Sequence, residues 1–250
     1  MTSKKVVRVD RAKADKAGGA SWRPTPESKG KATTYRIIAL LLWALAIAGE
    51  VFAIFYVLKQ PVVDMVMLIA AIVVIGVLAV IGSLLWKRAN LLDPASKADT
   101  VRFFIQNQLG AIIALVAFLP LIVMVLMNKS MDGKQKGIAT AVGVVVLAVA
   151  TLMGASFNPP SVEQYTADTA QVVSLTGRNL VFWTKEGNVY HLCQAASDLQ
   201  LESKDNTIYS GRVADARAAG KERLTLKVDM ELKQCGISTP TPAPASAPNR

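Results

Sequence analysis

The sequence has few of the residues on which most enzymes and small secreted scaffolds depend. It contains one histidine, His191, and only two cysteines, Cys193 and Cys235. Two cysteines exclude a scaffold held together by several disulfides. Charged residues make up 18% of the chain and hydrophobic residues 52%, which excludes an intrinsically disordered protein. The apolar residues form long uninterrupted blocks, which argues against an ordinary water-soluble enzyme.

Motifs for catalysis or cofactor binding are also missing from the sequence. It has no glycine-rich phosphate loop, no HExxH and no GxSxG. Any Ser/His or Cys/His catalysis would have to use His191, and nothing in the pattern orients Cys193 beside it. The apolar blocks contain no His or Cys to ligate haem, copper or an iron–sulfur cluster. We therefore expect a protein that is not an enzyme and carries no cofactor.

The net charge of +10 is concentrated at the N-terminus. Residues 1–36 hold ten Lys or Arg against three acids, whereas residues 158–236 hold nine bases and ten acids. We expect 1–36 to be a disordered arm that contacts anionic lipid. A nucleic-acid arm is the alternative, but Trp22 and Tyr35 are its only aromatic residues, so we expect no nucleic-acid partner.

Four apolar stretches are long enough to cross a bilayer as helices, which takes roughly 20 residues each. They occupy about 37–58, 62–86, 103–127 and 137–157. The expected fold class is therefore a membrane all-α domain of four transmembrane helices over 37–157, followed by a small C-terminal α+β domain.

The flanking charges predict the orientation of these helices. The arm and the second-to-third connection carry fourteen bases, against four on the other side (Lys59, Lys129, Lys134 and Lys136). The positive-inside rule then puts the N-terminus in the cytoplasm, and four crossings return the C-terminus there. We expect a multi-pass protein of the inner (plasma) membrane, although three lysines in one outer loop oppose this orientation.

Small residues recur four positions apart in three of the spans. Such spacing lets helix backbones approach closely in lipid. The pairs are Ala79 with Ser83, Gly110 with Ala114, Ala139 with Gly143, and Ala150 with Gly154.

Glu50 is the one acid well inside a predicted span. A carboxylate within the membrane suggests a functional site, because burying its charge is costly. One interpretation is a proton or cation relay. The other is a protonated side chain that hydrogen-bonds a neighbouring helix, or a side chain that reaches toward the outer interface. Gln106, Asn107 and Gln108 are expected near the inner face, too far from Glu50 in depth to extend a relay.

After Pro159 and Pro160 the pattern becomes that of a small α+β module over 158–237. The segments 180–184 and 189–192 predict a β-hairpin around a KEGN turn. Ile208 and Tyr209 suggest a short strand, and 213–219 a short helix closed by Gly220. Alternating apolar residues predict a strand over 224–232. The Pro/Ala-rich tail, 238–250, should be disordered.

The run VFWTKEGNVYH at 181–191 is followed by an alanine-rich helix that ends in glycine. This pattern resembles the metal-binding domain of the Ada DNA-repair proteins, whose motif reads Y-H-x4-C and later C-x-x-C. With four membrane helices before it, the chain resembles actinobacterial multi-pass membrane proteins that carry such a module. The resemblance covers at most residues 180–235.

The cysteines that the resemblance requires are replaced in this chain. Ala196 stands at the first cysteine position, and Thr225 and Val228 stand near the closing pair. A structural zinc site needs four N or S ligands. We therefore predict a degenerate module that lost its metal, in which His191 is a hydrogen-bonded structural residue. Two alternatives stay open: a Cys193–Cys235 disulfide, which conflicts with a cytoplasmic location, and a zinc site from His191, Cys193, Cys235 and an acid.

These observations predict an accessory, scaffold or assembly subunit of a larger membrane complex, such as a respiratory or cell-envelope complex. Its partners would be membrane lipids and other membrane proteins. One alternative is a small transporter or channel that uses Glu50. A second is a membrane-tethered metal or redox sensor that uses His191, Cys193 and Cys235.

Overall fold

The computed structural model describes residues 4–9 and 22–237, and they belong to two compact units. One unit, here called the bundle, is Pro24–Ser161. The other, here called the module, combines the N-terminal residues up to Arg23 with the chain from Val162 onward.

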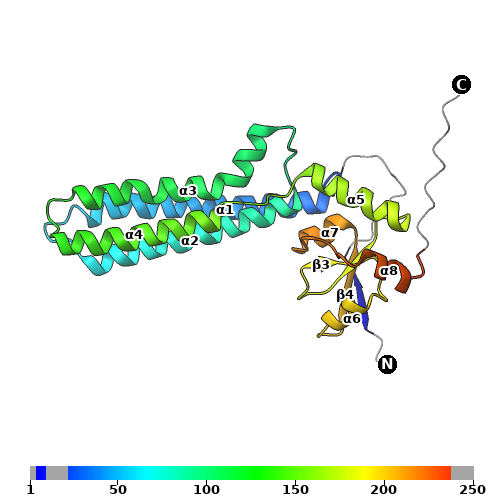
Figure 1. The fold of residues 1–250 in the computed structure, drawn as a ribbon. Coiled ribbons are helices and arrows are strands. Elements are labelled where there is room, and N and C mark those ends of the chain that lie inside the picture. Colours follow the sequence, from blue (N-terminus) through cyan, green and yellow to red (C-terminus); the bar gives the residue numbers. More distant parts are fainter. Residues whose placement is uncertain (1–3, 10–21, 238–250) are drawn as a thin grey trace, which may run out of the picture. The chain divides into compact units, whose positions relative to one another are not determined.

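The bundle consists of four long helices that run side by side (Figure 1). They are α1 (Pro26–Phe52), continued by a π-helical turn η1 (Ala53–Val57), then α2 (Met65–Leu92), α3 (Thr100–Met127) and α4 (Gly133–Gly154). Each is long and apolar enough to cross a membrane. The four predicted spans are thus confirmed as helices of that kind, and α1 begins eleven residues before the predicted start at 37.

Polar residues fix where these helices begin. The Thr25 side chain accepts the Ser28 N–H, and Pro26 occupies the first turn of α1. Asp64 and Asp99 cap α2 and α3 in the same way. Asp132 and Gln135 form a capping box at the start of α4. Such caps satisfy N–H groups that have no partner within the helix.

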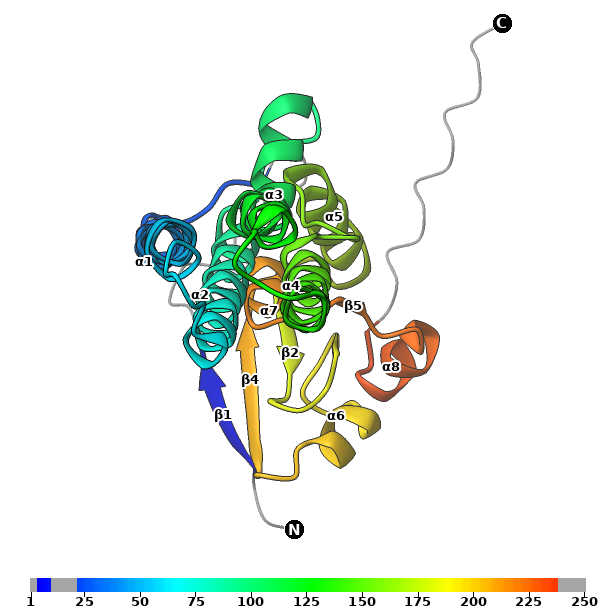
Figure 2. The ribbon, with the colours of Figure 1, turned by 90° about the vertical axis from the view of Figure 1, so that its left-hand side faces the viewer.

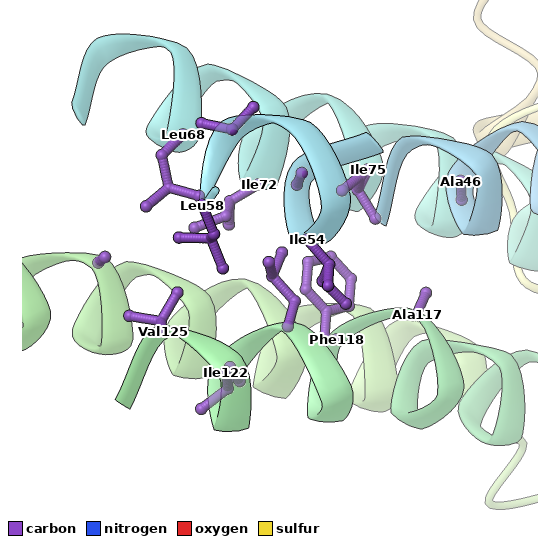
Figure 3. Packing of buried hydrophobic residues seen from close by; sticks show 14 of the residues in the cluster. Ala46, Ile54, Leu58, Leu68, Ile72, Ile75, Ala117, Phe118, Ile122 and Val125 are labelled. Atoms are coloured by element: carbon purple, nitrogen blue, oxygen red, sulfur yellow. The ribbon is translucent and has the colours of Figure 1, made fainter. Parts of the chain in front are cut away.

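Interlocking aliphatic and aromatic side chains fill the centre of the bundle (Figure 3). Ile72 and Ile75 of α2 are 1% exposed, and Phe118 of α3 is completely buried. Ile54 of η1 and Leu58, which directly follows η1, pack toward α3. Large side chains on the opposite helix faces remain exposed, as expected for surfaces that contact lipid.

Two glycines allow α3 and α4 to meet at backbone distance. A Cβ atom on Gly110 would lie 3.0 Å from the Cα of Gly154, and one on Gly154 would lie 2.5 Å from the Gly110 carbonyl carbon. Ala114, Ala139 and Ala150 are also buried. The close helix contact predicted from small residues is therefore confirmed at this crossing.

The module is built on two small sheets, with strand order β1-β4-β2 in the larger one (Figure 2). Strand β1 (Lys5–Arg8) is parallel to β4 (Thr207–Gly211), and β2 (Val181–Trp183) is antiparallel to it. In the second sheet β3 (Val189–Tyr190) is parallel to β5 (Arg223–Leu224).

Four helices complete the module: α5 (Val162–Thr176), α6 (Ser197–Glu202), α7 (Val213–Ala218) and α8 (Val228–Gln234). Val172, Trp183 and Val213, from three different elements, meet in one core. The predicted helix over 213–219 is confirmed, and Gly220 follows it with a positive φ of 86°. The predicted strand at Ile208 and Tyr209 is confirmed within β4.

The predicted hairpin is present only in part. Phe182 and His191 exchange both backbone hydrogen bonds, at 2.9 and 2.7 Å, in a single antiparallel bridge. Strand β3 then pairs with β5 instead of continuing along β2.

Three other expectations are corrected or extended. The strand predicted over 224–232 is wrong beyond Leu224, because the partly buried Val228 and the buried Leu232 pack into one core at helical spacing while Leu226 is 82% exposed. The arm 1–36 is not wholly disordered, since it contains β1 and the start of α1. Helix α5 was not predicted. Residues 10–21 and the predicted disordered tail 238–250 lie outside the described residues.

Candidate functional site

Polar side chains join the helices at the end of the bundle where α1 begins. Arg36 donates to the Asp93 carboxylate at 2.7 Å and to its carbonyl at 2.9 Å. Gln106 of α3 also donates to the Asp93 carbonyl, at 2.9 Å. Trp86 and Asn90 of α2 both donate to the Gln106 carbonyl. Buried hydrogen bonds of this kind hold helices in one arrangement.

The same end of the bundle is linked to α4. Lys87 donates to the Ala155 carbonyl at 2.6 Å, and Gln108 donates to the Ser156 carbonyl at 3.1 Å. Asn107 is 3% exposed and donates to the Phe103 carbonyl within its own helix. The three polar residues 106–108 therefore make contacts within the bundle and do not form a chain leading to Glu50.

Glu50 is 5% exposed, and its Oε1 has no hydrogen-bond partner among the described residues. Its carboxyl group faces the backbone N–H of Leu121, directly after Pro120 in α3. The π-helical turn η1 begins three residues after Glu50. A π-helical turn and a proline within a helix each interrupt the regular hydrogen bonding, and π-helical turns often mark functional positions. Glu50 thus combines a buried carboxyl with an open acceptor atom.

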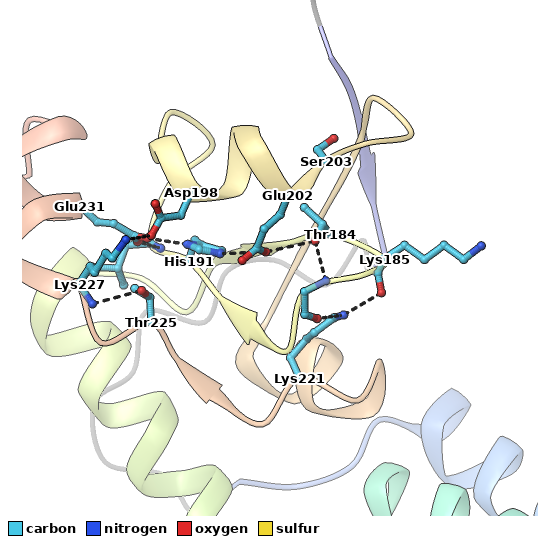
Figure 4. A network of polar contacts seen from close by, with 12 residues as sticks. Thr184, Lys185, His191, Asp198, Glu202, Ser203, Lys221, Thr225, Lys227 and Glu231 are labelled. Atoms are coloured by element: carbon cyan, nitrogen blue, oxygen red, sulfur yellow. Dashed lines mark hydrogen bonds and ion pairs between the residues drawn. The ribbon is translucent and has the colours of Figure 1, made fainter.

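In the module, the His191 side chain lies between two carboxylates (Figure 4). The ring is 1% exposed, and its Nδ1 is 2.5 Å from Oε1 of Glu231, which is itself 2% exposed. The other Glu231 oxygen accepts the Leu192 N–H at 2.9 Å. The second ring nitrogen, Nε2, has no hydrogen-bond partner among the described residues, and a carboxylate oxygen of Glu202 is 3.7 Å away.

The second carboxylate is positioned by a turn between β2 and β3. Thr184 lies 3.4 Å from the Glu202 carboxylate, and its hydroxyl accepts the Gly187 N–H at 3.1 Å. A side chain at Gly187 would collide with Glu202. Lys221 donates to the carbonyls of Lys185 and Gly187, and burial lowers the pKa of its ammonium group.

Helix α8 is held to the segment after β3 by further links. Cys193 and Cys235 form a disulfide with their Cα atoms 6.1 Å apart. The remaining links are the Lys227–Asp198 ion pair at 2.8 Å, which raises the pKa of Lys227, and hydrogen bonds between Ser197 and Gln234. The residues that the sequence singled out, His191, Cys193 and Cys235, thus lie along one seam between β3 and α8.

A second buried polar contact joins α5 to α7. Arg217 forms an ion pair with Asp168 and lies over the ring of Tyr165. Burial raises the pKa of Tyr165, and burial likewise raises the pKa of Tyr190 to about 12.

The His191 site has only part of what acid–base catalysis requires. A carboxylate orients one ring nitrogen, as in many catalytic pairs, but the other nitrogen is buried and faces a second carboxylate. Both sulfurs at the seam are joined in the disulfide. Within residues 4–9 and 22–237, no group of three His, Cys, Asp or Glu residues is arranged to hold a metal ion. The His191–Glu231 contact joins the segment after β3 to α8.

Sequence reasoning identified His191 but missed its two carboxylate partners. Glu231 lies 40 residues away in a segment that was expected to be a strand, and Glu202 lies in an unpredicted short helix. The spacing of Glu231 and Cys235, one helical turn apart, is the signal that could have placed both on one helix face.

Comparison of the chain with protein-family models, with curated proteins and with solved structures gave no match.

Proposed function

We propose that this protein is a non-enzymatic accessory or scaffold subunit of a larger membrane complex. Its helices would pack against other membrane proteins and lipids, and its module would contact soluble partners or subunits at the membrane surface.

The observation that carries this proposal is an apolar groove between α2 and α4 on the outside of the bundle. Its wider part, of about 750 Å³, is lined by Met65, Ile69 and Ile138, with Lys134 at one end. A narrower part of about 300 Å³ continues past Gly76 and Val146. Val73 lines both parts. An apolar groove that follows two helices suits a transmembrane helix of a partner, since lipid-exposed helices associate mainly by close packing.

The polar groups of the bundle also favour a scaffold. Gln106, Asn107 and Gln108 are used in hydrogen bonds within or between helices, which leaves them unavailable to line an aqueous path. Transport usually needs polar groups that face a shared cavity.

In the proposed orientation the four helices cross the inner (plasma) membrane and both termini lie in the cytoplasm. Pairing of β1 with β4 supports an even number of crossings, because strands of one sheet must share a compartment. The fourteen-to-four distribution of flanking bases favours the cytoplasmic side. The Cys193–Cys235 bond is typical of an oxidising compartment, so with this orientation we expect the two cysteines to be a dithiol in the cell.

Co-purification after extraction in a mild detergent tests the scaffold proposal. The expected result is one or more membrane proteins that co-purify in fixed stoichiometry and are lost when tryptophan replaces Val73. The matched control is Leu115→Trp, because Leu115 is equally exposed, at 45%, but lies on α3 outside the groove. Recovery of the wild-type chain free of partners would contradict the proposal.

A second candidate function is proton or cation transport through Glu50. The specific observation in its favour is the unpartnered Oε1 between η1 and the Pro120 region of α3. Proton flux into vesicles that contain the purified protein tests it. Glu50→Gln should abolish flux if the carboxyl carries protons, and identical flux from both proteins would exclude this role.

A further inference from the structure

The N-terminal strand β1 is attached to the module almost entirely by its backbone. It runs parallel to β4, with Lys5 opposite Thr207 and Arg8 opposite Ser210. The Lys5 N–H donates to the Asn206 carbonyl at 2.9 Å, and the Val9 N–H donates to the Ser210 carbonyl at 2.8 Å. Backbone pairing of this kind accepts many different side-chain sequences.

The side chains of β1 contribute little burial. Lys5, Val6 and Arg8 are exposed, Val6 by 40%, and Val7 is only half-buried. Strand β4, in contrast, is anchored without β1, because Ile208 is completely buried in a cluster with Ala196 and Leu199, and β2 pairs along its other edge. Removing β1 would therefore expose a formed sheet edge and leave the core of the module intact.

One side chain gives the edge a chemical preference. The Lys4 ammonium group donates to the Gln200 and Ser203 carbonyls, the latter at 3.2 Å. These carbonyls lie at the C-terminal end of α6, where the helix dipole favours a cation, although the Ser203 carbonyl also accepts the Asn206 N–H at 3.3 Å. The edge therefore fits an extended segment whose first residue is a lysine.

We propose that the β4 edge is a strand-docking site for an extended segment of a partner protein, and that β1 covers it in the free protein. The partner segment pairs parallel to β4 and places a lysine on the carbonyl end of α6. This inference rests on the proposed scaffold function and names the surface of the module that such a partner would use. Open sheet edges bind other chains readily, so a covering strand also prevents unwanted pairing.

A synthetic peptide of residues 4–9, KKVVRV, is the probe for this site. The test protein is the full chain without residues 1–9, in detergent micelles, and fluorescence anisotropy measures binding. We expect saturable binding, and about tenfold weaker binding when alanine replaces the first lysine, because a charged hydrogen-bond donor is lost. The full chain with Val7→Pro is a second test protein for the peptide, because the proline should displace β1 without shortening the chain.

Backbone methylation of the peptide gives a matched control. The N–H groups of Lys5 and Val9 both donate toward β4, and N–H groups of alternate residues in a strand point to the same side. The Val7 N–H therefore faces β4 and the Val6 N–H faces away. A peptide N-methylated at Val7 should not bind, whereas one N-methylated at Val6 should bind like the unmodified peptide. Equal binding of the two methylated peptides would overturn the proposed pairing.

The unaltered full chain shows whether β1 exchanges. A tethered strand at an effective concentration on the order of 1 mM should weaken binding about tenfold for a peptide whose own Kd is about 100 µM. No binding to the unaltered chain at millimolar peptide would show that β1 is a permanent strand, and no binding to either variant would show that the edge accepts no strand. Either result overturns the docking site.

A second copy of the chain is the competing occupant. Copies carrying Lys5→Cys and copies carrying Thr207→Cys, mixed in one membrane, would form crosslinked dimers if β1 exchanges between copies, and such dimers would overturn the partner proposal. Failure of these tests leaves the co-purification test of the scaffold function unaffected, so the two can be distinguished.

Discussion

Replacing Glu231 with alanine tests whether the buried His191–Glu231 contact holds α8 to the module. The substitution leaves Nδ1 of His191 and the Leu192 N–H without the oxygens that they contact at 2.5 and 2.9 Å. A buried polar group left without its hydrogen-bond partner costs about 1–3 kcal/mol, and two such groups lose their partner here. A unit of this size has a total stability of about 4–11 kcal/mol, so a large part of it should be lost.

Hydrogen–deuterium exchange of the full chain in detergent measures this loss locally. A loss of about 3 kcal/mol corresponds to roughly hundredfold faster exchange over 189–202 and 228–237. Glu231→Gln, which keeps one oxygen for Leu192, should give an intermediate effect. Asp198→Ala is the control, because it removes the solvent-exposed ion pair with Lys227, the residue just before α8, and should change exchange far less than Glu231→Ala. Equal exchange in the Glu231→Ala and Asp198→Ala proteins would refute the reasoning.

Three further predictions concern the tyrosines, the helix crossing and the disulfide. Burial raises the pKa of Tyr190 from 10 to about 12, so the unfolded chain loses its proton first between these pH values. The unfolding free energy should therefore fall by roughly 3 kcal/mol as pH rises across that window, and Tyr190→Phe should remove this share of the pH dependence in denaturant titrations. Gly154→Ala places a Cβ against the Gly110 backbone and should lower the thermal unfolding temperature of the bundle, whereas Gly137→Ala, with nothing within 4 Å, should not. Reduction of the Cys193–Cys235 bond, which spans 42 residues, should destabilise the module by up to about 4 kcal/mol, seen as a lower denaturant midpoint with reductant; an unchanged midpoint would contradict a stabilising crosslink.

The four long apolar helices were predicted well from the sequence because their signal is local. Each span is a continuous apolar run, and hydropathy alone identifies it. The predicted positions of the helix ends were less accurate. Helix α1 begins at Pro26, among polar residues that precede the apolar run, because Thr25 and Pro26 cap it there. The sequence indicated that small residues would allow a close helix contact. It did not indicate that Gly110 would meet Gly154, because many small residues share the same spacing.

The module was harder to predict because its contacts join distant residues. Alternation over 224–232 also fits a helix whose Val228 and Leu232 face inward, and only the packing of α8 decides between the two. His191 was identified by its rarity, but Glu231 and Glu202 become its neighbours only after α6 and α8 have packed. Strand β1 was missed because its four residues show no burial pattern and are stabilised by β4, some 200 residues later in the chain.

Thiol labelling in sealed cells tests the central claim, that four helices cross the membrane and leave the module in the cytoplasm. Cys193 and Cys235 are the only native cysteines, and Lys59→Cys adds one in the exposed connection between η1 and α2. After reduction, a membrane-impermeant maleimide should label position 59 in intact cells and the two native cysteines only after the cells are permeabilised. Labelling of Cys193 or Cys235 in intact cells, with position 59 protected, would contradict the account.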